Sequence, residues 1–187
     1  MSKPNIRAVL LDRDGVINFE SKDYILAPEQ WRPIPGSLEA IAQLNSANIP
    51  VAICSNQSAL ARGYFDKATM QAIHTKMIDA IEKAGGHISH TAYCPHGPDD
   101  NCTCRKPKPG LLIEALEQLD MIDRPQNIVF IGDSSRDVQA AVAAGVVPML
   151  VKTGHDDVDA IYKESAKLYP DIQTFADLAS AVSAILE

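Results

Sequence analysis

The chain has few aromatic residues and no long hydrophobic run. Aromatic side chains make up 5% of its 187 residues, and there is a single tryptophan. No apolar stretch approaches the roughly 20 residues that cross a bilayer. The first residues, Met1 to Pro4, lack the apolar core of a signal peptide. We therefore expect no membrane partner and a cytoplasmic protein.

Positive charge is also scarce. The 17 lysines and arginines are outnumbered by 24 acidic residues, which gives a formal net charge of −7. Nucleic acid or an anionic membrane surface would need a basic face, so neither is expected as the main partner. A phosphorylated small molecule remains compatible, because it needs only a local group of positive charges or a metal ion.

Cysteine is limited to four residues, and disulfides are not expected in a cytoplasmic protein.

A chain of this length with 46% hydrophobic residues is ordinary for one globular domain and too short for two full-sized ones. We expect residues 1–187 to form a single domain and the protein to be a monomer.

Short apolar runs alternate with helical patterns along the chain. This alternation predicts an α/β fold with right-handed crossovers, a doubly wound parallel sheet between two layers of helices. Ser37 is the expected N-cap of the first helix, and Val138, Ala141 and Val142 are the expected inward face of a later one. The expected strands are 6–11, 50–54, 88–93, 127–131 and 146–152. The expected helices are one from 37 that ends near 45–48, 66–84, 109–119, one through 138–142 that stops at 145, 156–167 and one from 174.

Asp12 and Asp14 follow the first buried strand, one residue apart and directly before Gly15. Two neighbouring carboxylates repel each other unless a cation lies between them, and oxygen ligands favour a hard ion such as Mg²⁺. Taken alone, the tripeptide is more typical of a strand that ends in an Asp-Gly turn.

Further polar residues stand at the ends of the other expected strands. The carboxyl ends of parallel strands meet at one edge of the sheet, so these residues should converge with Asp12 and Asp14. Carboxylates, a hydroxyl and a lysine suit metal-assisted phosphoryl transfer, in which one carboxylate attacks phosphorus and another transfers the proton. The additional residues are Ser55, Asn56, Arg105, Lys106, Asp133 and Asp137.

Four ordered segments resemble the motifs of the haloacid-dehalogenase superfamily of phosphatases over residues 6 to 152: residues 12–16, 54–57, 105–107 and 132–137. The resemblance implies that Asp12 is the nucleophile and Asp14 the acid/base. It also implies that Ser55 and Lys106 bind phosphate and that Asp12, Asp14, Asp133 and Asp137 form the Mg²⁺ site. Neither interval that usually holds a cap domain has room for one, so we expect a three-layer αβα, Rossmann-like fold without a cap.

A second group lies between residues 94 and 104. Cys94, His96, Cys102 and Cys104 are a three-thiol, one-imidazole set that suits a structural Zn²⁺. The alternative is four unrelated residues of a polar loop. Zinc would fix the loop that precedes Arg105 and Lys106, whereas Cys54 at the end of a buried strand is expected to be a core residue.

The zinc loop and the string from 55 to 65 resemble the heptose-bisphosphate phosphatase branch of the superfamily, and residues 152–154 are also similar. The resemblance implies hydrolysis of the 7-phosphate of D-glycero-D-manno-heptose 1,7-bisphosphate, for lipopolysaccharide precursor synthesis. Expected substrate-binding or phosphate-binding residues are Asn18, Ser55, Asn56, Gln57, Ser58, Arg105, Lys106 and Lys152.

Two alternatives are kept open. Histidinol-phosphate phosphatases share the zinc loop, and a phospho-accepting receiver domain of signalling proteins shares the doubly wound fold with acids, a hydroxyl and a lysine. A receiver carries its phosphorylated aspartate after the third strand, where this chain has Cys94.

Overall fold

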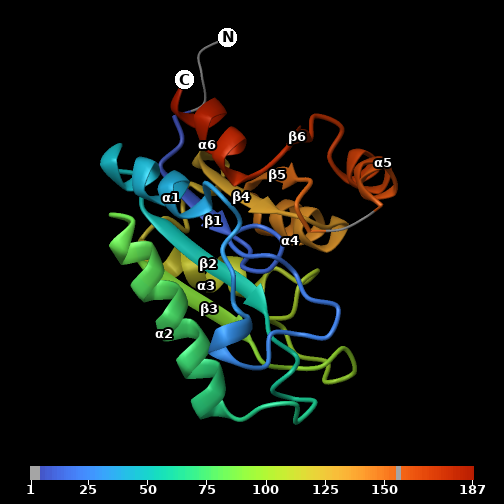
Figure 1. The fold of residues 1–187 in the computed structure, drawn as a ribbon. Helices are drawn as coiled ribbons and strands as arrows, with labels where there is room; N and C mark the ends of the chain where they lie inside the picture. Colours follow the sequence, from blue (N-terminus) through green and yellow to red (C-terminus); the bar gives the residue numbers. More distant parts are fainter. Residues whose placement is uncertain (1–4, 155–156) are drawn as a thin grey trace.

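The computed structural model describes residues 5–154 and 157–187, and it contains one six-stranded parallel sheet (Figure 1). The strand order is β3-β2-β1-β4-β5-β6, so the chain winds outward from β1 in both directions. This confirms the expected doubly wound α/β fold. The strands are β1 (Ala8–Leu11), β2 (Val51–Asn56), β3 (His90–Cys94), β4 (Ile128–Gly132), β5 (Val147–Val151) and β6 (Gln173–Phe175).

Helices cover both faces of the sheet. Residues of α1, α2 and α6 pack against one face, and residues of α3 and α4 pack against the other, with α5 next to α4. The three layers are visible in Figure 1. The helices are α1 (Ser37–Ser46), α2 (Lys67–Lys83), α3 (Gly110–Gln118), α4 (Ser135–Ala144), α5 (Val158–Leu168) and α6 (Leu178–Leu186), with short 3-10 turns η1 (Pro28–Gln30) and η2 (Pro125–Asn127).

Strand β1 is buried from end to end. Val9 and Leu11 belong to the core on the α1 side, whereas Ala8 and Leu10 belong to the core on the α3 side. A central strand covered on both faces has no polar side, which explains its unbroken apolar sequence. Alternate residues therefore hold the two helical layers to one strand.

The register of the sheet aligns the carboxyl ends of β1, β2 and β4. Leu11, the last residue of β1, pairs with Ile53 of β2 and Ile131 of β4. The amide of Asp12 then donates to the carbonyl of Ile131 at 2.9 Å. The residues that follow these three strands thus start from the same edge of the sheet.

The C-terminal region differs from the sequence-based expectation. Residues 173–175 form a sixth strand beside β5, with Phe175 opposite Val151, where we expected the start of a helix. Helix α6 begins only at Leu178, because Asp177 caps it by accepting from the Ser180 amide at 2.8 Å.

Three smaller expectations are also corrected or limited. Gly36, not Ser37, is the N-cap of α1, because the Ser37 hydroxyl donates to the carbonyl of Ile17 at 2.7 Å. Val142 is 44% exposed, and Ala140 takes its place on the inward face of α4. Residue 156, the expected start of the polar helix, lies outside the described residues.

Among the residues that the structure describes, no helix is both long and apolar enough to cross a membrane.

Candidate active site

A cleft of about 260 Å³ lies at the carboxyl edge of β1, β2 and β4. Its walls are mostly polar and come from segments far apart in the sequence, as the topology requires. Residues from all four sequence motifs reach it, and the lining includes Asp12, Asp14, Ser55, Asn56, Gln57, Ser58, Arg105, Lys106, Asp133 and Asp137.

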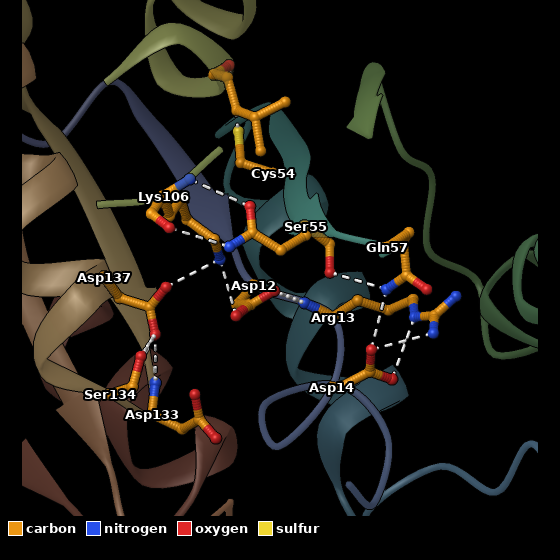
Figure 2. A network of polar contacts seen from close by, with 12 residues as sticks. Asp12, Arg13, Asp14, Cys54, Ser55, Gln57, Lys106, Asp133, Ser134 and Asp137 are labelled. Carbon is orange, nitrogen blue, oxygen red and sulfur yellow. Dashed lines mark hydrogen bonds and ion pairs between the residues drawn. The ribbon is translucent and has the colours of Figure 1, made fainter. Parts of the chain in front are cut away.

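Lys106 lies between two carboxylates. Its ammonium is 2.7 Å from Asp12 Oδ2 and 2.7 Å from Asp137 Oδ1. Burial lowers the pKa of Lys106, but the two carboxylates outweigh it and the net pKa is raised. The side chain is 2% exposed, so this cation is held in a fixed place beside Asp12 (Figure 2).

Asp12, Asp133 and Asp137 bring one carboxylate oxygen each to within 4.8 Å of one another. Burial and the Asp137 charge raise the pKa of Asp12 to about 6, although Lys106 opposes the shift. Burial, Asp137 and Asp12 raise the pKa of Asp133. Carboxylates crowded in this way are stabilised by a divalent cation, and an all-oxygen set fits Mg²⁺.

The start of α4 orients the Asp137 carboxylate, and two glycines enclose the Asp133 carboxylate. Asp137 Oδ2 accepts from the Ser134 amide at 3.0 Å and from its hydroxyl at 2.6 Å. Burial opposes ionisation of Asp137, but Lys106 and Ser134 outweigh it and its pKa is lowered. Gly15 and Gly154 enclose Asp133 so tightly that a Cβ on either glycine would overlap its carboxylate. Both glycines lie in segments that the sequence analysis singled out, but their contact with Asp133 was not predicted, because it is made only in the folded chain.

Asp14 points away from this carboxylate group (Figure 2). It accepts from Arg13 Nε at 3.1 Å and Nη2 at 2.9 Å, from Asn18 at 2.8 Å and from Gln57 at 2.9 Å. Burial alone would raise the pKa of Asp14, but Arg13 and the two amides outweigh it and the pKa is lowered. Its direct contact with Mg²⁺ therefore stays a prediction.

Arg13 is a residue of this site that sequence reasoning missed. Its side chain is buried, it lies 6.0 Å from the centre of the Tyr93 ring, and the Tyr93 hydroxyl lies 3.0 Å from His74 Nδ1. Its place between two acids was visible in the sequence, but no periodicity indicates that its side chain folds back on Asp14.

The end of β2 is joined to the loop that carries Lys106. The Asn56 side chain accepts from the Lys106 amide at 3.0 Å and donates to the Lys106 carbonyl at 3.1 Å. The Ser55 hydroxyl accepts from Gln57 at 3.1 Å, and Gln57 also holds Asp14. All four residues from 55 to 58 line the cleft, and Asn56 and Gln57 also position their neighbours.

Three expected substrate-binding residues lie in different settings. Arg105 lines the cleft and donates to the His96 carbonyl at 3.0 Å. Asn18 is fully buried behind Asp14. Lys152 lines a separate small cavity beside Asp133 and Tyr162, not the main cleft. The substrate-binding role of all three stays a prediction.

The expected zinc ligands come together. The Cys94 sulfur lies 3.6 Å from His96 Nδ1, 3.7 Å from the Cys102 sulfur and 3.2 Å from the Cys104 sulfur. All four ligand atoms lie within 4.8 Å of one another, which fits a closed tetrahedral Zn²⁺ site. Cys54 is outside the group, and burial raises the pKa of its thiol, in keeping with a core role.

The arrangement is suited to phosphoryl transfer. The Asp12 carboxylate lines the cleft beside the buried ammonium of Lys106. A second carboxylate, that of Asp14, lies two positions further along the sequence. Lys106 and the Ser55 hydroxyl can bind phosphate oxygens, and Mg²⁺ held by the acidic group would offset phosphate charge.

Comparison with known proteins agrees with this chemistry. The model of the haloacid dehalogenase-like hydrolase family matches residues 7–145. The D-glycero-beta-D-manno-heptose-1,7-bisphosphate 7-phosphatase of Pseudomonas aeruginosa is 45% identical over 180 residues, which are 96% of this chain and 97% of that protein. The protein of the same name from Pseudomonas putida is 43% identical over 173 residues, 91% of this chain and 98% of that protein.

A solved structure is similarly close. The crystal structure of the D,D-heptose 1,7-bisphosphate phosphatase from B. bronchiseptica, complexed with magnesium and phosphate, has a TM-score of 0.89 and 41% sequence identity. The match covers 97% of this chain and 98% of that one. By its sequence, its fold and the residues that line its cleft, this chain belongs to the haloacid dehalogenase-like hydrolase family.

Proposed function

We propose that the protein is a Mg²⁺-dependent phosphatase that removes the 7-phosphate of D-glycero-β-D-manno-heptose 1,7-bisphosphate. The observation that carries the proposal is the position of Asp12. It lies next to Lys106 and forms a cluster with Asp133 and Asp137 at the carboxyl edge of the sheet. The names of the relatives, at 40–47% identity over most of the chain, supply the substrate and its anomer.

In the first step, an Asp12 oxygen attacks phosphorus in line with the leaving oxygen of the sugar. The bond between phosphorus and that oxygen breaks, and protonated Asp14 gives the oxygen its proton. Lys106 and Ser55 hold the phosphate oxygens that gain charge, and bound Mg²⁺ supplies further charge neutralisation.

In the second step, a water molecule attacks the phosphorus of the aspartyl-phosphate. Asp14, now a carboxylate, takes the proton of the water, and the bond to Asp12 breaks. Inorganic phosphate and free Asp12 result, and Asp14 is protonated again. The Arg13, Asn18 and Gln57 contacts favour the carboxylate form of Asp14, which makes the protonated group a good proton donor in the first step and supplies the carboxylate that the second step requires.

The proposal includes a single domain that works without a cap. The interval 18–36 holds only the turn η1, and no helix or strand lies in residues 95–109. Specificity then depends on the loops around the cleft. We further propose a cytoplasmic monomer; the cytoplasmic location is supported by the reduced thiols that the zinc ligands need. Gel filtration with light scattering checks the oligomeric state.

The decisive experiment is a side-by-side assay of the heptose bisphosphate, sugar monophosphates and histidinol phosphate, with Mg²⁺ and with EDTA. We expect kcat/KM for the bisphosphate to be at least about tenfold higher than for the others, with heptose 1-phosphate as product and no activity in EDTA. A higher kcat/KM for histidinol phosphate would show that the proposed substrate is wrong. A stable phosphoprotein without turnover would favour a receiver.

Arg105 provides a test of substrate binding within this proposal. If its guanidinium binds the far end of the bisphosphate, Arg105→Ala raises KM for the bisphosphate more than for a small aryl phosphate. Arg105→Lys, which keeps the charge, separates this effect from loss of the contact with the His96 carbonyl. An equal rise for both substrates would contradict direct binding.

A further inference from the structure

Tyr24 and Tyr64 form an aromatic pair at the rim of the cleft in a chain that is otherwise poor in aromatic residues. Their ring centroids lie 5.3 Å apart, with the planes tilted by 60°. Tyr24 lines the cleft together with Asp12 and Lys106. The two tyrosines come from different loops, one after β1 and one between β2 and α2. The pair therefore links the loop that carries Tyr24 at the cleft to the loop between β2 and α2.

The backbone of Tyr24 adopts an unusual conformation. Its φ is +64°, a left-handed value that is rare for a bulky residue. The next residue, Ile25, is buried and anchors the loop in the core together with Trp31. Tyr24 itself remains 36% exposed. Such strain persists where the surroundings enforce it, and it gathers at ligand sites. Here it accompanies a tyrosine that lines the cleft beside the buried anchor.

Tyr64 supports this arrangement from the other loop. Its amide donates to the carbonyl of Ala59 at 3.0 Å, and Ala59 lines the cleft next to Ser58. The Tyr64 side chain is 51% exposed, so its packing against Tyr24 does not remove it from water. Burying either ring against a ligand would therefore add favourable apolar contact.

A pyranose ring with manno configuration offers one face that an aromatic ring can cover. In the usual chair of the β-anomer, the hydrogens on carbons 1, 3 and 5 are axial on the same side, opposite the axial hydroxyl on carbon 2. That side is apolar. In the α-anomer, the oxygen on carbon 1 and its phosphate stand on the same side and block it.

We propose that Tyr24, supported by Tyr64, packs against the C–H face of the sugar and thereby favours the β-anomer. The inference rests on the proposed function and adds the residue that recognises the sugar ring. The polar residues around Asp12 bind the phosphate, whereas Tyr24 is an aromatic wall of the same cleft.

The test compares Tyr24→Ala, Tyr24→Phe, Tyr64→Ala and Tyr64→Phe on three substrates: the β- and α-anomers of the bisphosphate, and glycerol 3-phosphate, which is too short to carry a ring. We expect Tyr24→Ala to raise KM for the β-anomer about three- to tenfold and to reduce the β/α ratio of kcat/KM by a similar factor. Tyr64→Ala has a smaller effect in the same direction, and both Phe variants stay close to wild type.

Activity on glycerol 3-phosphate should stay within about twofold in every variant, because only sugar contact is removed. Ile122→Ala, which removes an exposed apolar side chain from the turn after α3, is the control and should change none of these ratios. Thermal unfolding checks that each variant is folded.

Two outcomes separate this inference from the proposed function. If wild type hydrolyses the bisphosphate but Tyr24→Ala leaves KM and the anomer ratio unchanged, the inference is wrong and the function stands. An equal loss on all three substrates also overturns it, because that result indicates a structural role. If wild type does not hydrolyse the bisphosphate, the proposed function fails, and the inference fails with it.

Discussion

Arg13 holds both oxygens of its neighbour Asp14, donating from Nε at 3.1 Å and from Nη2 at 2.9 Å. A planar guanidinium matches a carboxylate in this way, and an ammonium does not. The centre of the Tyr93 ring lies 6.0 Å from the guanidinium carbon, so Tyr93 helps to hold the guanidinium in this two-bonded position. Arg13 thus fixes the direction of the carboxylate that we assign to proton transfer.

Replacing Arg13 with lysine keeps the charge and removes the two-bonded contact. If Arg13 positions Asp14, Arg13→Lys lowers kcat about ten- to a hundredfold for a sugar phosphate, whose leaving oxygen needs a proton. The loss should be several times smaller for 4-nitrophenyl phosphate, which leaves without one. Steady-state assays of both substrates check this, with exposed Arg32→Lys as the control. Equal losses would assign Arg13 a purely structural role.

Asp12→Asn tests the nucleophile. Asparagine keeps the shape of the side chain but is a poor nucleophile, so kcat should fall by at least about three orders of magnitude if the covalent route holds. The fold should persist, because burial already penalises the charge of Asp12 and raises its pKa to about 6. Turnover and thermal unfolding are measured together. Substantial residual activity would remove Asp12 from this role.

Gly154→Ala tests the position of Asp133. A Cβ on Gly154 would overlap the Asp133 carboxylate, so the carboxylate must move and the affinity for Mg²⁺ should fall about tenfold or more. A Mg²⁺ titration of activity and of thermal stability measures the change. Gly85→Ala is the matched control: Gly85 has a φ of +87° with open space around it, so the variant should cost about 1 kcal/mol of stability without changing Mg²⁺ affinity. Equal Mg²⁺ affinities in the two variants would refute this account of Asp133.

The cysteine cluster predicts about one zinc ion per chain in protein purified without added zinc. Cys102→Ser and Cys104→Ser should each reduce the zinc content and the unfolding temperature, because each removes a thiolate from the set of four. Cys54→Ala is the control: Cys54 is buried and lies outside the set, so this variant should bind as much zinc as wild type. Elemental analysis measures the zinc content per chain. A stable wild-type protein without zinc would show that the cluster is not a zinc site.

Much of the fold could be predicted from local patterns. The unbroken apolar run at β1 indicates a central parallel strand, because only a strand covered on both faces can lack a polar side. Asp66 caps the start of α2, and Gly145 caps the end of α4, as local capping rules predict. The strand at 173–175 was missed, because three residues carry no usable period and become a strand only by pairing with β5.

The convergence of Asp12, Lys106, Asp133 and Asp137 could also be predicted, since strand ends of a parallel sheet share an edge. The sequence determined which groups gather there and which chemistry they suit. The tertiary structure decided which way each side chain points: Asp14 toward Arg13, Lys152 into a separate cavity, and Tyr24 onto the cleft beside Tyr64. Spacing along a chain gives the element on which a residue lies. Its orientation depends on contacts with residues that only folding brings near.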